Sequence, residues 1–257
     1  MIMGLRDAVY AAYERRLRAG LAGRPRPEHV AIMLDGNRRW ARAMGLDDVN
    51  HGHRVGASKI GDVLDWCAEA GVQHVTLFLL STDNLSRPSK ELDPLLRIIE
   101  GVAEELSAEG QPWRITAVGA LDLLPAETAA ALKAAEEHTV DRTGMRVNVA
   151  VGYGGRREIA DAVRSLLQQH VEAGTPLEDV AEMLDVEHIA AHLYTRGQPD
   201  PDLVIRTSGE QRLSGFLLWQ SANSEFYFCD ALWPDFRKVD FLRALRDYAE
   251  RQRRFGE

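Results

Sequence analysis

The alternation of two kinds of apolar segment constrains the fold of this chain more than any other feature. Five short segments, rich in β-branched or other apolar residues and bounded by turn residues, predict buried strands. They span 30–34, 74–80, 114–118, 146–151 and 203–206. Segments with apolar residues at helical spacing lie between them, over 57–70, 92–106, 127–138 and 158–171. This alternation predicts an α/β fold in which helices cover both faces of a parallel sheet.

The two ends of the chain complete this pattern. A first helix is predicted at 5–20, a sixth strand at 226–229 and a last helix at 241–253. No linker rich in Pro, Ser or Gly divides the 257 residues, so we expect a single domain over residues 1–257. Within it, residues 1–28 form the first helix and its lead-in, and residues 238–257 form the last helix and the tail.

The first helix is amphipathic, and its role has two interpretations. Leu5, Val9, Tyr13 and Leu17 lie on one face, and several arginines lie on the other. Most helices of this kind pack on their own domain, which is the favoured interpretation. The alternative is a helix that lies on a membrane surface. We therefore expect at most a peripheral membrane contact.

Composition and charge exclude several classes of protein. No apolar stretch reaches transmembrane length, and the N-terminus lacks the pattern of a signal peptide. Cys67 and Cys229 form neither a disulfide framework nor a metal-ligand spacing, so we expect a cytoplasmic protein. The net charge of −8 argues against nucleic-acid binding, which requires a basic footprint. Local clusters of arginine still allow an anionic small ligand.

Polar motifs follow the predicted strands at the point where each strand ends. Asp35 and two arginines follow the first strand, residues 81–87 follow the second, and residues 152–155 follow the fourth. The fifth strand ends at the start of the polar stretch 206–214. Ligands of open parallel sheets bind beyond the carboxyl ends of the strands. The motifs therefore predict one enzyme site at that edge of the sheet.

The first motif joins a carboxylate to two guanidinium groups, in Asp35-Gly36-Asn37-Arg38-Arg39. Gly36 allows the backbone to approach a ligand, and the N–H groups of a following helix bind an anion. Arg39 adds charge-assisted hydrogen bonds to phosphate oxygens. Asp35 fits a hard cation that bridges to phosphate. A helix N-cap is the alternative role for this aspartate.

The second and third motifs add further polar groups. Asn84 fits a role in orienting substrate or water, and Arg87 fits a phosphate contact, although a capped loop explains other polar residues of that stretch. Arg206, Arg212 and Ser214 supply two guanidinium groups and a hydroxyl within nine residues. That combination suits a diphosphate better than a solvated loop.

Motifs for other cofactors are absent. The sequence has no GxxxxGK(S/T), no GxGxxG and no HExxH. His51 and His53 are two residues apart, which is a poor spacing for a metal pair on a helix. His53 is therefore interpreted as a hydrogen-bonding or proton-transfer residue.

Seven stretches together resemble the cis-prenyltransferases, the family of undecaprenyl diphosphate synthase. They read HVAIMLDGNRRWA, GHRVGASKI, LSTDNLSRP, VAVGYGGRREI, DLVIRTSGEQRLSGFLLWQ, SEFYF with LWPDF, and RRFG. They occur in the family order from His29 to Gly256, over nearly the whole chain. The resemblance implies a mostly parallel six-stranded sheet flanked by helices, a hydrophobic tunnel and a homodimer.

The resemblance also implies the reaction and the roles of single residues. The implied reaction is the Mg²⁺-dependent condensation of isopentenyl diphosphate with an allylic diphosphate. By position, Asp35 recruits Mg²⁺, Glu225 is a second acidic residue near the metal, and Asn84 assists condensation. The predicted allylic diphosphate-binding residues are Gly36, Asn37, Arg38, Arg39, His53 and Arg87. The predicted isopentenyl diphosphate-binding residues are Arg206, Arg212, Ser214 and, from the tail that reaches a partner's site, Arg254 and Gly256.

Leu79 is the most informative departure from the long-chain members of the family, which carry alanine at this position of the tunnel wall. A leucine there blocks a growing chain, although an ordinary core position is the alternative. In carrying both Leu79 and Arg38, the chain resembles the actinobacterial short-chain enzymes, which make (2Z,6E)-farnesyl diphosphate from geranyl diphosphate. The alternative is a medium- or long-chain polyprenyl diphosphate synthase. A non-catalytic scaffold subunit is less favoured, because Asp35 and the arginines are present.

Overall fold

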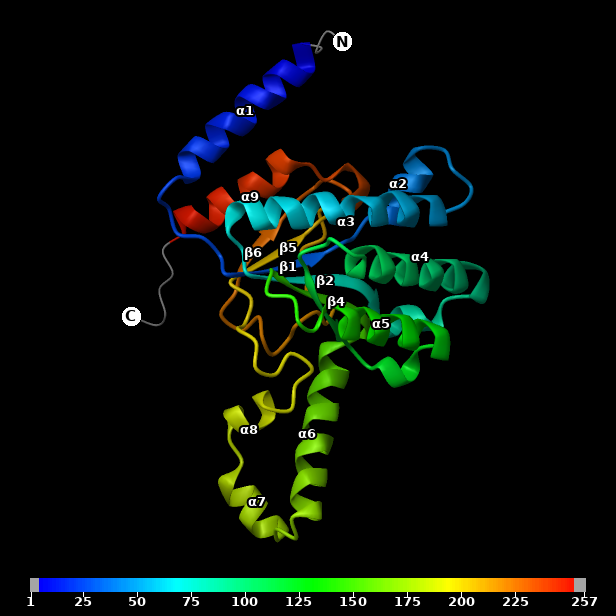
Figure 1. Cartoon of the computed structure of the whole chain (residues 1–257), viewed down its shortest axis with the longest axis vertical. Coiled ribbons are helices and arrows are strands. Elements are labelled where there is room, and N and C mark those ends of the chain that lie inside the picture. The colour runs from blue at the N-terminus through cyan, green and yellow to red at the C-terminus, as the bar shows by residue number, and fades with distance from the viewer. Residues whose placement is uncertain (1–4, 252–257) are drawn as a thin grey trace.

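The computed structural model describes residues 5–251, and its centre is a six-stranded sheet (Figure 1). The strands are β1 (His29–Met33), β2 (His74–Ser81), β3 (Arg114–Val118), β4 (Arg146–Tyr153), β5 (Leu203–Arg206) and β6 (Glu225–Phe228). Their order is β3-β4-β2-β1-β5-β6, and every neighbouring pair is parallel. The predicted α/β fold is confirmed, and the sheet expected to be mostly parallel is parallel throughout in the described chain.

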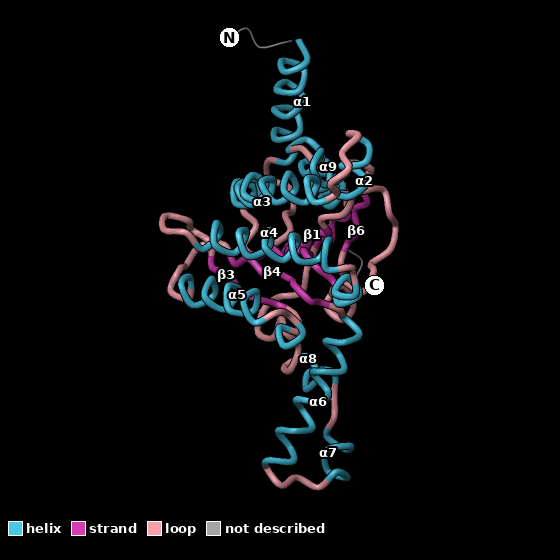
Figure 2. Tube along the Cα trace, turned by 90° about the vertical axis from the view of Figure 1, so that its right-hand side faces the viewer, coloured by secondary structure: helices cyan, strands magenta, loops and turns pink. Residues whose placement is uncertain are grey.

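Helices flank this sheet and also extend beyond it. They are α1 (Leu5–Leu21), α2 (Asn37–Ala43), α3 (Asn50–Ala70), α4 (Ser89–Ser107), α5 (Ala126–Thr139), α6 (Gly155–Glu172), α7 (Leu177–Met183), α8 (Val186–Ala190) and α9 (Lys238–Glu250). Short 3₁₀ turns are η1 (Thr82–Ser86), η2 (Leu121–Leu123) and η3 (Trp233–Asp235). The sequence does not predict α7 and α8, which are too short to show helical periodicity. Together with α6 they project from the body at the end opposite α1 (Figure 2).

The two faces of the sheet are buried against different partners. One face packs on α3, α4, α5 and α9 and forms the larger core. The other face packs on Phe216 and Leu217, which belong to the irregular segment after β5. Phe216 also stacks on Phe78 of β2, with 4.6 Å between the ring centroids. Because Arg212 and Ser214 lie in the same segment, these apolar contacts help to hold two predicted site residues in place.

Helix α3 begins at residue 50, earlier than the predicted start at residue 57. Its first two turns are polar and rich in glycine, so they lack the apolar repeat that predicts a helix. Close packing requires those glycines: a Cβ on Gly52 would lie 2.1 Å from the Asn37 carbonyl oxygen, and one on Gly56 would lie 2.2 Å from Asn37 Oδ1. Contacts with α2 thus override a weak helix propensity, and they carry His53 to the edge of the sheet.

Helix α1 packs against α9 and against Arg237, the N-cap residue of α9. Leu17 is buried, the Arg237 guanidinium lies 4.9 Å from the Tyr10 ring centroid, and Arg243 lies 5.1 Å from that of Tyr13. These contacts agree with the interpretation that the helix packs on its own domain. Val9, by contrast, is 60% exposed. Within residues 5–251, no helix combines the length and the apolar character needed to cross a membrane.

We predict that protonation of His29 destabilises the fold in acid. Burial lowers the pKa of His29 to about 4, and the ring bonds to the Pro199 carbonyl and to Thr76 Oγ1. The unfolded chain binds this proton near pH 6.5, so the contribution is complete above that pH and is lost as the pH falls toward 4. The loss at pH 5 amounts to about 2 kcal/mol.

Urea unfolding at pH 8 and pH 5 measures this effect in the wild type and in His29→Gln. The free energy of unfolding should depend less on pH in the variant, by about 2 kcal/mol over this interval. His138→Gln, at an exposed position, serves as the control and should retain the wild-type dependence. Equal acid sensitivity in wild type and His29→Gln would contradict the prediction.

Candidate functional site

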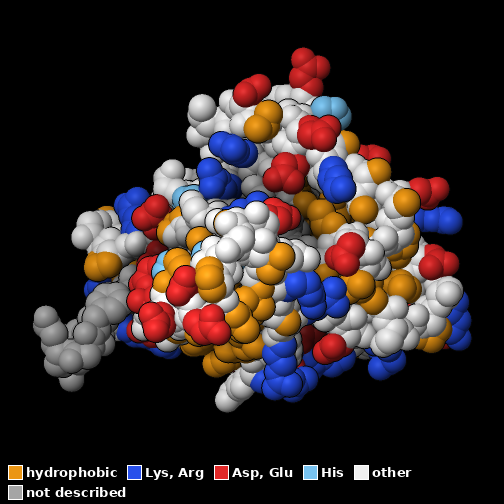
Figure 3. Space-filling model, turned by 90° about the horizontal axis from the view of Figure 1, so that it is seen from below, with side chains coloured by type: hydrophobic (Ala, Val, Ile, Leu, Met, Phe, Trp, Pro, Cys, Tyr) orange, Lys and Arg blue, Asp and Glu red, His pale blue; other side chains and the backbone are white. Residues whose placement is uncertain are grey.

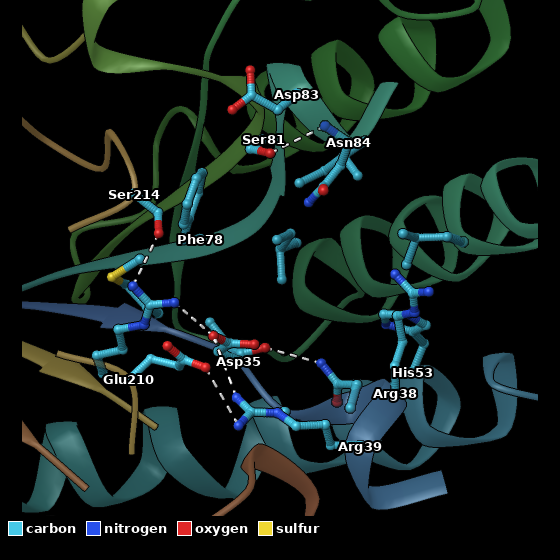
Figure 4. Close-up of a pocket in the computed structure, with 18 of the residues that line it drawn as sticks. Asp35, Arg38, Arg39, His53, Phe78, Ser81, Asp83, Asn84, Glu210 and Ser214 are labelled. Atoms are coloured by element: carbon cyan, nitrogen blue, oxygen red, sulfur yellow. Dashed lines mark hydrogen bonds and ion pairs between the residues drawn. The ribbon is translucent and has the colours of Figure 1, made fainter. Parts of the chain in front are cut away.

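The carboxyl ends of β1, β2 and β5 border a cavity of about 520 Å³ (Figure 4). Residues of α2, α3 and α4 complete its walls. The predicted site residues that line it are Asp35, Gly36, Asn37, Arg38, Arg39, His53, Leu79, Asn84, Arg87, Arg206, Arg212 and Ser214. The parallel sheet therefore collects, at one edge, motifs that lie far apart in the sequence. The predicted Arg254 and Gly256 lie outside the described residues.

An ion pair between neighbouring strands lies inside this cavity. The β1–β5 register sets Met33 opposite Arg206, so Asp35 follows directly beyond the paired ends. Arg206 Nη2 donates to Asp35 Oδ2 at 2.8 Å, and the Arg206 side chain is only 5% exposed. Arg206 also donates to the Arg212 carbonyl and to Ser214 Oγ, the latter at 3.0 Å. One buried guanidinium thus fixes both the carboxylate and the loop after β5.

Asp35 is an anion that is available to the cavity. Burial raises the pKa of its carboxyl, but the hydrogen bond and charge of Arg206 lower it, and Ser208 and Arg39 lower it as well. Together they outweigh burial, so the pKa lies below its usual value. Gly36, at φ 109°, occupies the N-cap position of α2, and no side chain caps this helix end. The alternative role of Asp35 as an N-cap is therefore wrong.

Positive charge dominates the cavity although the whole chain carries −8. Among the described lining residues, six arginines accompany three carboxylates, which leaves an excess of three positive charges. Arg42 and Glu210 belong to this set and are absent from the sequence prediction. Glu210 lies 3.5 Å from Arg39 and also pairs with Arg212. A concave site with this surplus suits a ligand that carries several negative charges.

Glu91, also absent from the predicted residues, holds two of the arginines. Its Oε1 lies 3.2 Å from Arg87 Nη1 and 3.4 Å from Arg38 Nε. Arg87 donates in addition to Asn84 Oδ1 at 3.0 Å. The spacing of four residues between Arg87 and Glu91 is a sequence signal for this pair.

His53 lies beside these arginines. Burial and the charges of Arg87 and Arg38 lower the pKa of His53 to about 4, so its ring is neutral at pH 7.

A β-bulge at the end of β2 turns consecutive side chains toward the same cavity. The β2–β4 register shifts between Phe78 and Leu80 and again between Leu80 and Ser81, so Leu79 has no partner in the register on β4. Successive side chains of a regular strand point to opposite faces. Here Phe78, Leu79, Leu80 and Ser81 all line the cavity. A bulge re-aims side chains in this way.

A second, smaller cavity of about 30 Å³ adjoins the first. Its walls come mainly from apolar residues of α3 and α4, and the residues that line both cavities are Leu34, Asn37, His53, Leu79 and Leu95. This volume is roughly the space that one water molecule takes in the liquid. The predicted hydrophobic tunnel is therefore a short apolar recess in this structure, with Leu79 at its junction with the charged cavity.

The acidic groups of the cavity fit a metal that is shared with a ligand. Within residues 5–251, no three His, Cys, Asp or Glu side chains gather closely enough to form a metal site. Mg²⁺ is usually held by one or two carboxylates together with substrate phosphates and water. Asp35, with its side chain 37% exposed in a cavity lined by arginines, fits that mode.

Glu225, the second predicted metal residue, lies elsewhere in the chain. The β5–β6 register sets it opposite Leu203, at the amino end of the strands, whereas Asp35 follows their carboxyl end. Its carboxylate pairs with Arg251 at 2.7 Å. A parallel strand order separates the two acidic residues, so a single chain does not bring them together.

Comparison with known proteins identifies the family. The family model for undecaprenyl diphosphate synthase matches residues 32–256. The chain belongs to this family, the cis-prenyltransferases. The predicted family and the prediction of an enzyme that transfers prenyl groups are both confirmed.

Named relatives of this cis-prenyltransferase cover nearly its whole length. A (2Z,6E)-farnesyl diphosphate synthase of Thermobifida fusca is 64% identical over 252 residues, which are 98% of either chain. A short-chain Z-isoprenyl diphosphate synthase of Mycobacterium bovis is 55% identical over 254 residues, which are 98% of this chain and 97% of the relative. The crystal structure of lavandulyl diphosphate synthase from Lavandula x intermedia, in complex with dimethylallyl diphosphate, matches with a TM-score of 0.82 and 38% identity. That match covers 90% of this chain and 98% of the other.

We predict that Asp35→Asn lowers the turnover of this cis-prenyltransferase by about 10³-fold, because the variant loses the only carboxylate that pairs with Arg206 among the described residues. The amide keeps the shape of the side chain but leaves the buried guanidinium without a counter-charge. A loss of about 1–2 kcal/mol in unfolding free energy should follow, since the pair is partly exposed.

Steady-state turnover with Mg²⁺ and urea unfolding measure the two effects. Asp47→Asn, which removes an exposed carboxylate at some distance in the sequence, is the control. It should change neither quantity appreciably. Turnover of Asp35→Asn within about threefold of wild type would rule out the assigned role, since such a loss is well under 1 kcal/mol.

Proposed function

We propose that this chain is a Mg²⁺-dependent short-chain cis-prenyltransferase that condenses isopentenyl diphosphate with geranyl diphosphate. The proposed product is (2Z,6E)-farnesyl diphosphate. The observation that carries the proposal is the junction at Leu79, where a cavity rich in arginine meets an apolar recess of about 30 Å³. A diphosphate with a short apolar tail has this distribution of charge and apolar surface. The names of the relatives from Thermobifida fusca and Mycobacterium bovis support the same product class.

The arginines give the site its chemical function. When the allylic C–O bond breaks, its electron pair leaves with the diphosphate and an allylic cation remains. Arg38, Arg39 and Arg87 stabilise the negative charge as it develops. Mg²⁺ bound by Asp35 and phosphate oxygens would add further charge neutralisation when it is present. The second substrate then forms the new C–C bond with the allylic cation and loses a proton, which the released diphosphate can accept.

Glu91 and Glu210 serve as internal counter-ions before substrate binds. Glu91 pairs with Arg38 and Arg87, and Glu210 pairs with Arg39. A diphosphate is a stronger multivalent partner for guanidinium groups than one carboxylate. Substrate would therefore displace the glutamates. Because the glutamates already hold the arginines in the cavity, little side-chain ordering would remain to be done on binding.

Neutral His53 fits the same site. Its Nε2 is buried and has no hydrogen-bond partner among the described residues. A neutral ring can donate one N–H to a phosphate oxygen without adding charge. We propose that His53 contacts the allylic diphosphate in this way.

We also propose that the protein is a cytoplasmic homodimer. Strand β6 is an edge of the sheet, and its Phe228 side chain is 38% exposed. Apolar side chains are also exposed along the projecting α6–α8 region, with Val171 77% and Leu177 72% exposed (Figure 3). Exposed apolar surface of this kind favours burial against another chain. Glu225 and Asp35 lie at opposite ends of the strands within one chain. If Glu225 acts near the metal, it would therefore have to come from the second chain of the dimer.

We predict that Leu79→Ala lengthens the product. The substitution removes an isopropyl group at the junction of the two cavities and thereby opens the recess. Purified enzyme is incubated with Mg²⁺, isopentenyl diphosphate and geranyl diphosphate, and the products are separated by chain length. Wild type should stop at C15, and the variant should make products longer by at least one isoprene unit.

Leu121→Ala provides a matched control for this experiment. Leu121 is also a partly buried leucine that packs against the core, but it lines neither cavity. Its product should remain C15. Long products from wild type would support the alternative of a medium- or long-chain synthase and refute the short-chain proposal. Absence of any product from wild type would support the scaffold alternative.

A further inference from the structure

One aromatic ring faces a cavity that is otherwise rich in charge. Of the described residues that line the cavity, Phe78 is the only one with a benzene or indole ring. Six arginines and three carboxylates belong to the same lining, and Phe78 is only partly buried among them. An aromatic side chain in this position does more than fill the core, because part of its surface is available to a ligand.

Phe78 lies between the regions proposed for the two substrates. The next residue, Leu79, marks the junction with the apolar recess, where the allylic tail would lie. Phe216, which stacks on Phe78, is two residues from Ser214 of the predicted isopentenyl diphosphate site. Figure 4 shows Phe78 on the opposite side of the cavity from Arg38. The ring therefore borders the part of the cavity where carbon atoms of the two substrates would meet.

Neighbouring rings hold Phe78 in one orientation. Phe216 covers one face, with 4.6 Å between the ring centroids and 11° between the ring planes. Tyr153 is perpendicular to both rings and lies 5.9 Å from Phe78 and 6.0 Å from Phe216. These nearly equal distances place Tyr153 at the side of the stack, since a ring over the far face of Phe78 would be much farther from Phe216. The far face is thus left for a ligand.

The arginines of the cavity do not take this face. Among the described residues, the rings that lie under a guanidinium group are those of Tyr10 and Tyr13, which are outside the cavity. Arginine commonly stacks on aromatic rings. Here Glu91 and Glu210 hold arginines of the cavity by ion pairs instead. The Phe78 ring therefore remains available to another cation.

We propose that Phe78 is a catalytic residue whose ring stabilises the carbocation of the condensation. The allylic C–O bond breaks, its electron pair leaves with the diphosphate, and positive charge appears on the allylic carbons. The alkene electron pair of isopentenyl diphosphate then forms the C–C bond, which moves the charge to a tertiary carbon. Loss of a proton to the released diphosphate ends the sequence.

The ring itself takes part in no bond change. The face of an aromatic ring is negative because of its quadrupole, and it attracts a cation that lies over it. Unlike a carboxylate, a benzene ring cannot combine with the carbocation to form an ester. This inference rests on the proposed function, because it assigns a residue to a step that this function requires.

Fluorine substitution separates the charge of the ring face from the shape of the ring. Each fluorine withdraws electron density and weakens the attraction for a cation, while the ring keeps nearly the same size. Mono-, di- and trifluorophenylalanine, incorporated only at Phe78, should lower the single-turnover rate roughly twofold per fluorine, or about tenfold in all. Single-turnover rates, measured with enzyme in excess, separate the chemical step from product release.

The same series at Phe216 is the matched control. Phe216 shares the stack with Phe78 but lines neither cavity. Fluorine on either ring alters the stack, so the urea midpoint of unfolding should shift alike in the two series. The single-turnover rate of the Phe216 series should stay within about twofold of wild type.

Binding of a charged mimic gives a readout that does not require turnover. Geranyldimethylamine is protonated at pH 7 and joins a positive charge to a geranyl tail. Its affinity, measured by calorimetric titration with inorganic diphosphate present, should fall about tenfold over the Phe78 series. The unreactive thio-analogue of geranyl diphosphate has the same tail without the positive charge. Its affinity should stay within about twofold throughout.

Three results would overturn the proposal. The first is a single-turnover rate that stays constant over the Phe78 series. The second is an equal loss of rate in the Phe78 and Phe216 series, which would indicate an effect of packing. The third is an equal loss of affinity for the ammonium and for the thio-analogue. Failure of the proposed function is distinguishable from all three: wild type would then make no prenyl product, while binding of the ammonium would still report on the ring.

Discussion

The ion pair between Asp35 and Arg206 is the interaction on which the rest of the site depends. A guanidinium as buried as that of Arg206 requires a counter-charge and hydrogen-bond acceptors, because an uncompensated buried charge is strongly destabilising. Asp35 supplies the charge, and the Arg212 carbonyl and Ser214 Oγ supply further acceptors. The pairing of β1 with β5 thus joins the first motif to the loop after β5. Arg39 also approaches Asp35, at 3.9 Å, whereas Glu91 holds Arg38 and Arg87.

The bulge at Leu79 gives the site its second property, a sharp change from charge to apolar surface. The change occurs within one strand, since the consecutive residues Leu79, Leu80 and Ser81 of β2 all line the same cavity. A regular strand would send alternate side chains into the core on the other face. Under the proposed function, the bulge sets a boundary for the apolar tail close to the arginines that would bind the diphosphate. A short product would follow from that distance.

Much of this arrangement is predictable from the sequence, because each strand can be recognised from its own short apolar segment. Ligands of open parallel sheets bind beyond the carboxyl ends of the strands, which is enough to place Asp35, Arg87 and Arg206 at one edge of the sheet. Glu225 is different: its position depends on the register of β6 against β5, which no local pattern specifies. The bulge at Leu79 likewise depends on the partner strand β4.

The counter-ions and the aromatic ring of the cavity escape prediction for another physical reason. Glu91 and Glu210 look like ordinary charged surface residues, and only their partners in the fold reveal that they hold arginines of the site. Phe78 looks like an ordinary strand residue, and its place in the charged cavity appears only when the bulge and the stack with Phe216 are known. Tertiary contacts, rather than propensity, set the role of these residues.

The central claim is that one end of the site binds a diphosphate and the other admits only a short apolar tail. Calorimetric titration with unreactive thio-analogues of dimethylallyl, geranyl and farnesyl diphosphate, in the presence of Mg²⁺, tests it most directly. Each buried CH₂ contributes about 0.8 kcal/mol, so affinity should rise by at least about tenfold from the C5 to the C10 analogue. It should then fall for the C15 analogue, whose tail meets Leu79. A further rise of about tenfold for the C15 analogue would contradict the claim, because it would require a tunnel that continues past this residue.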